Sequence, residues 1–589
     1  MINIDFFSTI WPLLTERRKG QFWLILLLMG LSSLLEVVSL GAVLPFLGAL
    51  VNPEILFNNP SIGPIVRFFE LSSANQLPLI ITTIFIVATV LSASVRLLLL
   101  YVMIKFSYAV GADLSIMIFR KTLYQDFSVH MSRNSSEVIN GIITKTNTII
   151  GGVVKPIMTI ISSSLFIVAI ITTLAFIDLN TSMVAFFGFG GLYLMIVRQS
   201  KYRLIRNSKL IAHESNKMIK TLQEGMGGVR DVLIDGSQEY YCKLYRESDL
   251  LFRKATGDNM FISGSPRFIM ESLGMSIIAI LAYVMSLGED GLSMVIPTLG
   301  AFALGAQRLL PAFQQVYGAY SNIKGSQESF KDIEILLNQP IKSDFCTESK
   351  VNIKFEKEIK VKGLSFAYDG SNTHVLKDIN FSIPKGGHIG FIGKTGSGKS
   401  TLVDIIMGLL NPTDGGLYID GELISQKNKN SWQKNIAHVP QNIYLSDNTI
   451  AENIAFGLKP KDINYNQVYA AAKKAQLIEL IKDLPDGYQT IVGECGIKLS
   501  GGQRQRIGIA RALYKQANVL IFDEATSALD NNTESEVMRS IEKLDDSLTV
   551  LIIAHRLTTL KGCNYVVKLD KGTIFDILEY KDIDNDSNK

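Results

Sequence analysis

Two unlike halves are visible in the pattern of hydrophobic and polar positions. Up to about residue 325 the chain holds long apolar stretches, and from about residue 350 onward short apolar runs alternate with charged segments. The long stretches span roughly residues 21–50, 77–106, 153–176, 182–197, 261–287 and 292–320. About 20 apolar residues are needed to cross a bilayer. One such run could be a buried helix of a globular core, but six in one half predict six transmembrane helices.

Basic residues predict the orientation of these helices. Lys and Arg are concentrated before the first stretch, between the second and third, and between the fourth and fifth, while the alternate connections hold little besides Arg67. Because Lys and Arg accumulate on the cytoplasmic side, we expect both termini in the cytoplasm. The basic segments are patterned for helix and should extend the membrane helices. In the outer connection at 51–76, IGPIVRFFEL predicts either a short surface helix or an ordered loop.

The segment GHIGFIGKTGSGKST at 387–401 predicts a strand, a glycine-rich turn and a helix that begins at Lys399. It fits the GxxxxGK[ST] pattern of a phosphate-binding loop, in which glycines let backbone N–H groups close around phosphate. Lys399 would reach the β- and γ-phosphates of ATP, and Ser400 would ligate Mg²⁺. The candidate nucleotide-binding residues here are Gly393, Lys394, Thr395, Gly396, Ser397, Gly398, Lys399, Ser400 and Thr401.

A second segment, NVLIFDEATSALD at 518–530, predicts a buried parallel strand that ends at Asp523 and Glu524. Open α/β sheets place their sites at the carboxyl ends of such strands. Asp523 would hold Mg²⁺, and Glu524 would polarise the attacking water as general base. A structural acidic cap is the alternative for either carboxylate taken alone.

Composition argues against several other classes of function. The net charge of +4 over 589 residues is too small to indicate a nucleic-acid partner. The four cysteines show no CxxC spacing, so neither a disulfide framework nor a zinc site is indicated. We expect no secretory signal, because the first apolar run is too long for one.

Between the two nucleotide-site segments, LSGGQRQRIGIARAL at 499–513 predicts either another anion cradle or a plain helix cap at Ser500. The chain carries, in this order, the phosphate loop, LSGGQ, LIFDE, SALD and IIAHR. With these motifs, residues 353–575 resemble the nucleotide-binding domain of an ABC ATPase. The resemblance implies that Tyr368 stacks on adenine and that Gln441 contacts Mg²⁺ and the attacking water. It also implies that His555, which the strand TVLIIA would carry to the site, contacts the γ-phosphate; a solvated or helix-capping histidine is the alternative.

The same resemblance implies sites that two subunits complete. Ser500 and Gly502 would bind the γ-phosphate of ATP held by the opposite subunit, and Asp530 would span the interface. Gly501 and Gln503 of the same segment are further candidates for ATP binding. Since one chain holds one set of motifs, we expect a homodimer with two ATP sites. The expected domains are a membrane domain at 1–330, a linker at 331–352 and an ATPase domain at 353–589.

Fusion of the two domains in this order resembles exporters. The expected fold class is therefore a membrane α-helical bundle of six transmembrane helices, type I ABC exporter-like, followed by an α/β P-loop ABC ATPase domain. A soluble ABC ATPase for DNA repair would lack the six spans, whereas an ATP-gated channel or sensor on the same scaffold stays open as an alternative.

Two basic segments, YQDFSVHMSRNSSEVINGI at 124–142 and GGVRDVLIDGSQEYY at 227–241, resemble the coupling elements of exporters. Asp126, Asp235 and Gly236 break the helical pattern, so we expect turns at these positions. An ordinary solvated helix surface is the alternative for both segments.

Three arginines, Arg96, Arg267 and Arg308, lie inside the apolar stretches, where a charge costs about 2.5–3.5 kcal/mol on insertion scales. Arg267 is four residues from Glu271 and could form a helix pair with it, and Arg96 could neutralise Glu36. Arg308 then has no obvious partner. Arginines that line a cavity suit an anionic head, phosphate above all, because guanidinium binds it bidentately. Structural ion pairing is the alternative.

Three patterns surround the acidic and basic residues just named: E..SLG...PFL, PRF.ME..G and A..R.LPAF. They resemble the bacterial lipid-linked oligosaccharide flippases and their polysaccharide-export relatives. In that family, membrane arginines are thought to meet the lipid-pyrophosphate. The expected function is therefore ATP-driven flipping of an anionic lipid-linked glycan across the inner, cytoplasmic membrane. A general exporter of lipids, drugs or peptides is the alternative.

Overall fold

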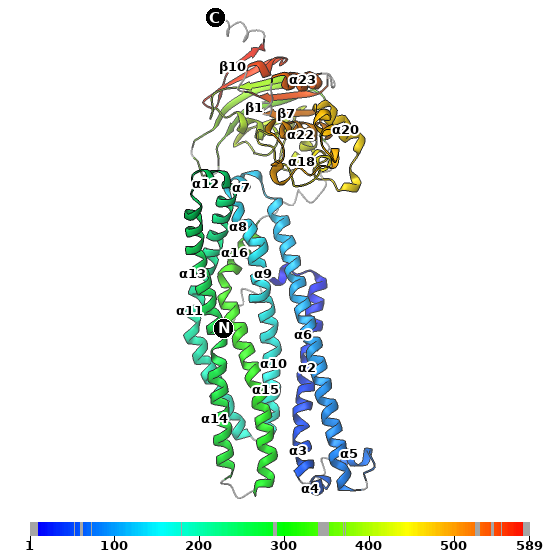
Figure 1. The fold of residues 1–589 in the computed structure, drawn as a ribbon, viewed down its shortest axis with the longest axis vertical. Coiled ribbons are helices and arrows are strands. Elements are labelled where there is room, and N and C mark those ends of the chain that lie inside the picture. Colours follow the sequence, from blue (N-terminus) through cyan, green and yellow to red (C-terminus); the bar gives the residue numbers. More distant parts are fainter. Residues whose placement is uncertain are drawn as a thin grey trace. The chain divides into compact units, whose positions relative to one another are not determined.

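The computed structural model describes residues 10–580, apart from 52, 59–62, 72, 178, 287–290, 340–352, 369, 372, 525–530, 543–546 and 555–556. Contacts between Cα atoms divide the chain into two compact units. The first comprises Met1–Leu123 and Arg133–Pro340, and the second comprises Tyr124–Ser132 and Ile341–Lys589 (Figure 1).

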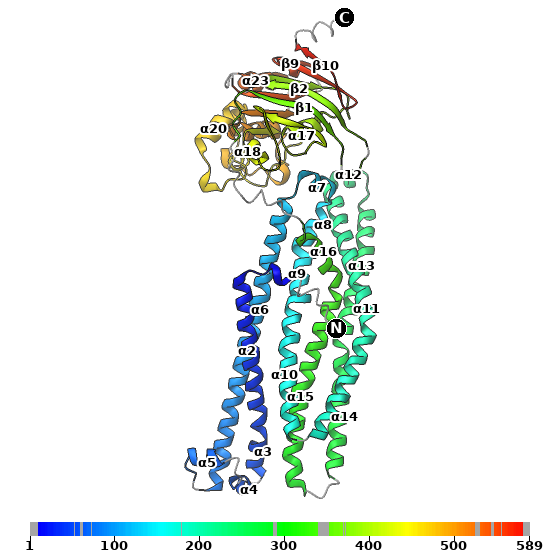
Figure 2. The same cartoon turned by 180° about the vertical axis from the view of Figure 1, so that it is seen from behind.

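The first unit is helical, and its long helices lie side by side in both views (Figures 1 and 2). The longer helices are α2 (Glu16–Gly41), α6 (Leu77–Leu123), α10 (Lys155–Ile177), α11 (Leu179–Gly227), α13 (Gln238–Gly264), α14 (Pro266–Ser286) and α15 (Gly291–Gly325). The shorter ones are α3 (Val43–Val51), α4 (Pro53–Phe57), α5 (Gly63–Phe68), α8 (Ser135–Asn140), α9 (Thr146–Ile149), α12 (Val229–Ile234) and α16 (Gln327–Leu337). The short helix α5 occupies part of the outer connection, as one of the two alternatives expected.

Within the described residues, three helical stretches are long and apolar enough to cross a membrane: Glu16–Val51, Ala74–Leu123 and Ser135–Phe176. They contain the first three apolar stretches of the sequence. Of the remaining three stretches, the fourth falls on α11, the fifth on the end of α13 and on α14, and the sixth on α15. Parts of α11, α14 and α15 lie outside the described side chains. Helices α6 and α11 continue well beyond their apolar parts into the basic segments, as the helical pattern predicts.

Small residues allow these helices to approach closely. A Cβ atom on Gly111 of α6 would lie 2.0 Å from a side-chain carbon of Ile150, and one on Gly305 of α15 would lie 2.9 Å from Leu174 of α10. Helices in a membrane gain no hydrophobic driving force from one another, so close packing of this kind stabilises their association.

Two turns of π-helix interrupt the helical segment that precedes α10. They are η3 (Gly141–Lys145) and η4 (Ile150–Val154), on either side of α9. Each π turn holds one residue more than an α turn accommodates, and such turns are frequent at functional sites.

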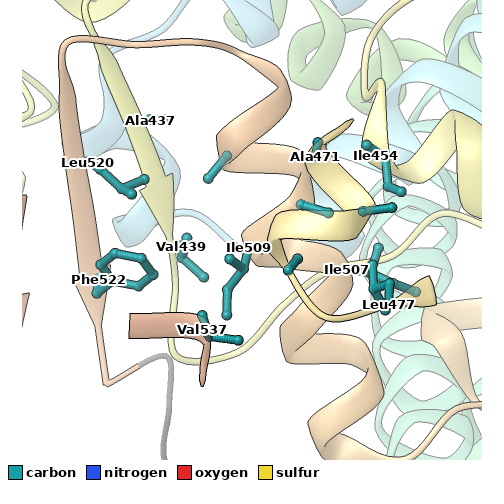
Figure 3. Packing of buried hydrophobic residues seen from close by; sticks show 14 of the residues in the cluster. Ala437, Val439, Ile454, Ala471, Leu477, Ile507, Ile509, Leu520, Phe522 and Val537 are labelled. Atoms are coloured by element: carbon teal, nitrogen blue, oxygen red, sulfur yellow. The ribbon is translucent and has the colours of Figure 1, made fainter. Parts of the chain in front are cut away.

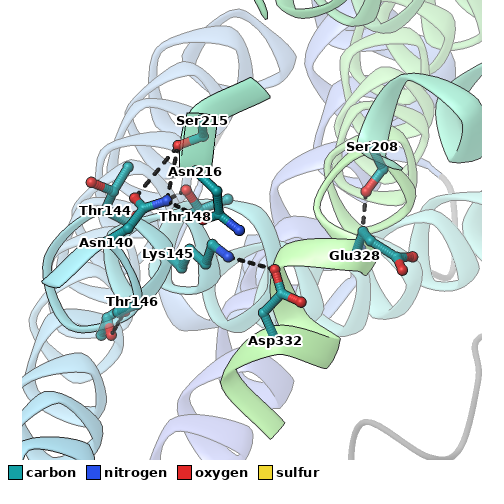
Figure 4. Close-up of polar contacts among 11 residues, drawn as sticks. Asn140, Thr144, Lys145, Thr146, Thr148, Ser208, Ser215, Asn216, Glu328 and Asp332 are labelled. Atoms are coloured by element: carbon teal, nitrogen blue, oxygen red, sulfur yellow. Dashed lines mark hydrogen bonds and ion pairs between the residues drawn. The ribbon is translucent and has the colours of Figure 1, made fainter. Parts of the chain in front are cut away.

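Polar side chains join this π-helical segment to its neighbours (Figure 4). Lys145 of η3 donates to a carboxylate oxygen of Asp332 on α16 at 2.5 Å. Asn140 of α8 donates to Ser215 and Asn216 of α11 at 3.2 and 2.7 Å. The segment is therefore held between α11 and α16 by specific polar contacts.

The second unit is built on two sheets. The strands are β1 (Glu358–Phe366), β2 (Leu376–Pro384), β3 (His388–Ile392), β4 (Asp414–Ile419), β5 (Glu422–Leu423), β6 (Ile436–Val439), β7 (Val519–Asp523), β8 (Thr549–Ile553), β9 (Tyr565–Asp570) and β10 (Thr573–Glu579). A four-stranded antiparallel sheet has the order β2-β1-β4-β5. A six-stranded sheet has the order β10-β9-β3-β8-β7-β6, and only the β9–β10 pair is antiparallel.

Helices cover the parallel part of the six-stranded sheet, and their apolar side chains form two hydrophobic clusters with it, one of which is shown in Figure 3. The main helices here are α17 (Lys399–Ile406), α18 (Lys429–Lys434), α19 (Ile450–Ile454), α20 (Tyr465–Lys474), α22 (Gly501–Tyr514) and α23 (Asn531–Glu542). In Figure 3, Val439 and Phe522 of the sheet face Ile509 of α22 and Val537 of α23. Strands that are buried on both faces read as continuous apolar runs, which explains the unbroken VLIF and TVLII patterns.

The segment Tyr124–Ser132 packs with this second unit although it follows α6 in the chain. Its helix α7 (Phe127–Ser132) begins after a break at Asp126, and Asp126 accepts from Lys429 of α18 at 3.2 Å. Both side chains are largely buried. The second break expected, at Asp235 and Gly236, separates α12 from α13, and Gly236 has a φ of 63°.

Candidate functional site

The phosphate loop joins β3 to α17 in the arrangement expected from the sequence. Residues Gly393–Gly398 form the turn, and α17 begins at Lys399. Gly393 has a φ of 156°, and a Cβ atom there would lie 2.3 Å from the carbonyl oxygen of Leu569. Gly398 has a φ of 99°, which a side chain rarely permits. The glycines thus give the backbone a path that other residues could not follow.

The side chains of this loop are suited to a nucleotide. Lys399 donates to the carbonyl oxygens of Gly393 and Lys394 at 2.8 and 3.2 Å, so its ammonium group is folded over the loop. The hydroxyl of Ser397 is buried and has no hydrogen-bond partner among the described residues. Tyr368 bonds Thr401 through its hydroxyl at 3.0 Å, which brings its ring beside the start of α17. A buried, unsatisfied hydroxyl and a lysine beside open backbone amides fit a bound polyphosphate.

The acidic residues lie at the same edge of the sheet. Strand β8 separates β3 from β7, and all three are parallel, so the ends of β3 and β7 meet the same edge. Asp523 ends β7, and burial raises its pKa, as does the charge of Glu524, while Lys399 opposes the shift. Gln441 donates to a carboxylate oxygen of Glu524 at 2.6 Å. Loop and strand thereby bring Lys399, Gln441, Asp523 and Glu524 into one site.

Sequence reasoning missed Asp404, a further carboxylate of this site. It lies on α17, and burial together with the charge of Asp523 raises its pKa to about 6. The signal was available in the sequence: an aspartate one helical turn beyond Ser400 stands on a helix that otherwise reads as apolar.

Ser500 is the N-cap of α22. Its hydroxyl accepts from the backbone of Gln503, whose side chain accepts from the backbone of Ser500, so the two form a capping box. The helix cap that was one alternative for this segment is therefore present. An N-cap also leaves the amides of Gly501 and Gly502 at the helix start, where an anion is favoured.

Contacts within the second unit link α22 to the loop that carries Gln441. A Cβ atom on Gly508 of α22 would lie 2.2 Å from Ile443, so the loop rests directly on the helix backbone. Arg511 of α22 donates to the carbonyl oxygens of Tyr444 and Asn453, both at 2.9 Å. Two of the site residues expected from the sequence, Asp530 and His555, lie outside the described residues.

The helices of the first unit line an open cavity of about 720 Å³. Its polar lining consists of Ser32, Ser33, Arg96, Lys155, Thr159, Ser162, Ser163, Arg308, Gln315 and Asn322. Lys155, Thr159 and Ser163 recur at helical spacing and so form one polar face of α10. Lys155 was missed from the sequence because it stands at the edge of an apolar stretch.

The expectation that Arg308 lacks a partner is wrong. Arg308 of α15 forms an ion pair with Glu36 of α2, and its second nitrogen donates to Ser39 at 3.5 Å. Arg96 of α6 lies 3.8 Å from the other carboxylate oxygen of Glu36, and its guanidinium stands over the ring of Phe166 at 4.9 Å from the centroid. Sequence separation hides the Glu36–Arg308 pair, because only the helix bundle brings α2 and α15 together.

Arg267 lies apart from these two arginines. It bonds Glu271 at 2.6 Å, as the spacing of four residues predicts, and lines a separate cavity of about 140 Å³ with Tyr193 and Gln314. In the single chain, the three arginines therefore do not share one cavity.

Comparisons with known proteins agree with both units. Residues 28–303 match the family described as ABC transporter transmembrane region, and residues 376–527 match the family described as ABC transporter. The ATP-dependent lipid A-core flippase of Francisella tularensis subsp. tularensis is 28% identical over 478 residues, 79% of this chain and 77% of the relative. The protein of the same name from Alkalilimnicola ehrlichii is 29% identical over 406 residues, 67% of each chain.

A solved structure shares the fold over nearly the whole length. The structure of a bacterial Atm1-family ABC exporter with ATP bound matches with a TM-score of 0.78 at 21% identity, over 97% of each chain. The expected fold class is thus confirmed: an exporter-type transmembrane helical region followed by an ABC ATPase domain. With both regions in this order, the chain belongs to the ABC transporters that carry a transmembrane region and an ATPase domain in one chain and couple ATP hydrolysis to transport.

Proposed function

We propose that this transporter flips an anionic lipid, a lipid-linked glycan carrying phosphate or pyrophosphate, across the inner membrane with both termini in the cytoplasm. The observation that carries the proposal is the cavity of about 720 Å³ in the transmembrane unit, which Arg96, Lys155 and Arg308 line together with hydroxyl and amide groups. Guanidinium groups bind phosphate bidentately, and charges at this depth usually face a cavity that uses them. An apolar cavity would have favoured drugs.

The relatives support a lipid as cargo. Both that are described above are named lipid A-core flippases, and their likeness to this chain extends over two thirds of its length or more. We extend the proposal to a lipid-linked glycan because of the motif patterns around Glu36, Arg267 and Arg308. Arg267 of α14, which lines the smaller cavity, is a third candidate residue for binding the cargo.

For hydrolysis, we propose that Ser400, Gln441 and Asp523 hold Mg²⁺, whose charge would stabilise the phosphates during the transfer. Glu524 orients the attacking water and takes its proton, and Gln441 holds the Glu524 carboxylate through the bond of 2.6 Å. Tyr368 supports adenine, and His555 contacts the γ-phosphate. The buried contact between Asp126 and Lys429 would carry movement of the ATPase domain to α6 and α8, which flank the Tyr124–Ser132 segment in the chain.

We further propose a homodimer. Ser500, Gly501, Gly502 and Gln503 would close over ATP held by the partner's phosphate loop, and Asp530 would lie at the interface. Each chain holds one phosphate loop and one LSGGQ segment, so two such composite sites would form.

The proposal is tested by ATPase measurements on protein in lipid vesicles, with and without a polyprenyl-pyrophosphate oligosaccharide. We expect the lipid-linked sugar to stimulate wild type about threefold or more and Arg308→Ala to lose most of that stimulation while it keeps basal turnover. Glu524→Gln is the hydrolysis-deficient control. Arg253→Gln is the matched control, since Arg253 pairs with Asp249 at an exposed position outside the cavity.

Equal stimulation of wild type and Arg308→Ala by apolar drugs, with none by the lipid-linked sugar, would favour the second candidate, a general exporter of lipids, drugs or peptides. The membrane arginines would then be structural charges.

A further inference from the structure

The carboxylate of Glu36 lies behind the arginines of the main cavity. Its side chain is 1% exposed and does not line the cavity, whereas those of Arg308 and Arg96 are 28% and 49% exposed and do. Ser92 donates to Glu36 at 2.8 Å, which fixes one carboxylate oxygen. The cavity therefore presents the cationic side of an ion-pair cluster and hides its anion.

The charges of this cluster do not balance. One carboxylate faces two guanidinium groups, so the cluster keeps a net charge of +1, and Lys155 adds another in the same cavity. A buried charge without a partner is costly, and here Glu36 is the anion that the described residues supply to Arg308 and Arg96. Any anion that enters the cavity must compete with this carboxylate for the donors of Arg308.

We propose that Glu36 is a resident counter-anion, which the phosphate of the cargo displaces from Arg308 and which takes Arg308 back when the cargo leaves. This inference rests on the proposed function and specifies how the same cavity selects and releases its cargo. In this scheme the Arg308 guanidinium is always paired with an anion, either the Glu36 carboxylate or the phosphate of the cargo.

Exchange has a consequence for specificity. A cargo carboxylate would bind Arg308 no more strongly than Glu36 does, because the two groups have the same charge and the same acceptor oxygens. A zwitterionic head has a smaller net negative charge. A phosphate or pyrophosphate ester carries more negative charge and three acceptor oxygens, and it can engage Arg96 and Arg308 together. The cargo class is therefore a phosphate or pyrophosphate ester of a lipid, not a carboxylate or a zwitterion.

The test compares wild type with Glu36→Gln, which keeps the shape and an acceptor for Ser92 but removes the competing charge. The probe is dioctanoyl phosphatidic acid, titrated into the purified full chain with saturating ADP to occupy the phosphate loops. We expect Glu36→Gln to bind it about tenfold more tightly, since a unit charge close to the guanidinium is removed. Glu224→Gln, which removes an exposed ion pair with Lys220 outside both cavities, is the matched control and should leave the affinity unchanged.

Turnover gives a second readout that a merely structural role would not produce. In Glu36→Gln, the probe concentration for half-maximal ATPase stimulation should fall, and the maximal stimulation should fall as well, because release is slowed. Dodecanoate, which has a carboxylate head and no phosphate, and inorganic phosphate serve as comparison probes. Dodecanoate should bind more weakly than phosphatidic acid. Tighter binding of phosphatidic acid than of inorganic phosphate identifies a lipid headgroup as the source of the anion.

The outcomes separate this inference from the proposed function. If Arg308→Gln weakens binding of the probe but Glu36→Gln binds no more tightly than wild type, Glu36 is structural and the inference is overturned. If wild type and Arg308→Gln bind equally, the anion-binding function itself fails, and the inference fails with it. Should Glu36→Gln not fold, Glu36→Asp, which draws the carboxylate away from Arg308, is expected to bind about threefold more tightly, and unchanged affinity would refute exchange.

Discussion

At the scale of single residues, the ionised carboxylate of Asp404 is destabilised in the nucleotide site, where it is partly buried and close to Asp523. Its pKa of about 6 lies above the 3.8 of an unperturbed aspartate, because burial and Asp523 disfavour the carboxylate. A group whose folded-state pKa is raised in this way binds its proton more tightly when folded. The ionised form therefore lowers stability above pH 6, and the penalty fades as the pH falls from 6 toward 4.

We predict that Asp404→Asn raises the midpoint of thermal unfolding of the full chain at pH 7.5 by about 2–4 °C, corresponding to ~1 kcal/mol after allowance for solvent screening. Tryptophan fluorescence during a thermal ramp measures this, and the gain should shrink between pH 6 and pH 4. Asp414→Asn, at an exposed position of β4, is the control. A gain that does not depend on pH would show that the charge of Asp404 is not its cause.

Motif residues and residue partners differ in how well the sequence predicts them. Lys399, Asp523 and Glu524 could be assigned from local pattern alone, because each stands at a strand or helix end that the pattern marks. The partner of Arg308 could not, because Glu36 lies on the first long helix and Arg308 on the last. Ion pairs between helices depend on packing, which hydropathy does not encode.

At the scale of elements, Lys145 and Asp332 join η3 to α16, the last described helix of the first unit. The two partners are unequally buried: the Lys145 side chain is 6% exposed and the Asp332 side chain 35%. Removal of Asp332 leaves a buried ammonium without its carboxylate, whereas removal of Lys145 leaves a carboxylate that water can reach.

We therefore predict that Asp332→Ala destabilises the protein by about 1–3 kcal/mol and Lys145→Met by less than ~1 kcal/mol. Thermal unfolding of the purified proteins, ranked against wild type, measures the difference. Lys331, next to Asp332 in the chain, forms an exposed ion pair with Glu328. Lys331→Met removes that pair and should leave stability nearly unchanged. The reverse order, with Lys145→Met the more damaging, would mean that lysine packing matters more than its charge.

Strands and long helices followed from the sequence. Continuous apolar runs such as VLIF and TVLII are typical of strands buried on both faces, and stretches of about 20 apolar residues are typical of membrane helices. The two π turns did not follow. Their sequences, GIITK and IGGVV, are rich in glycine and β-branched residues, but such a composition does not distinguish a π turn from a weak α-helix. The turns lie where glycines allow close contact with other helices of the chain: Gly141 faces Leu336, Gly111 faces Ile150 and Gly152 faces Ser326.

At the scale of the whole molecule, the proposed composite sites allow a complementation experiment. Lys399→Ala disables the phosphate loop, and Ser500→Arg disables the LSGGQ segment. In a heterodimer of the two variants, one site would combine both defects, and the other would combine the intact phosphate loop of one chain with the intact LSGGQ segment of the other. We predict that neither homodimer hydrolyses ATP and that the heterodimer, purified through two different tags, recovers up to about half of wild-type activity.

The control is the heterodimer in which one chain carries both substitutions and the other is wild type, which keeps no intact composite site. If that control is active and the complementing heterodimer is not, each chain completes its own site and the proposed arrangement is wrong. The sequence implies this arrangement only through its likeness to ABC ATPases. No local pattern in one chain reveals whether a residue completes the ATP site of its own chain or that of the partner.

The π turns at Gly141–Lys145 and Ile150–Val154 also bear on how this chain tolerates changes of length. Loss of one residue from either turn would restore α geometry and leave Lys155 and Thr159 on the side that faces the cavity. The same loss within α10 would rotate everything beyond it by about 100° and shorten it by about 1.5 Å. The two π turns are thus the places in this helix where the chain can lose one residue without rotating its cavity-facing side toward lipid.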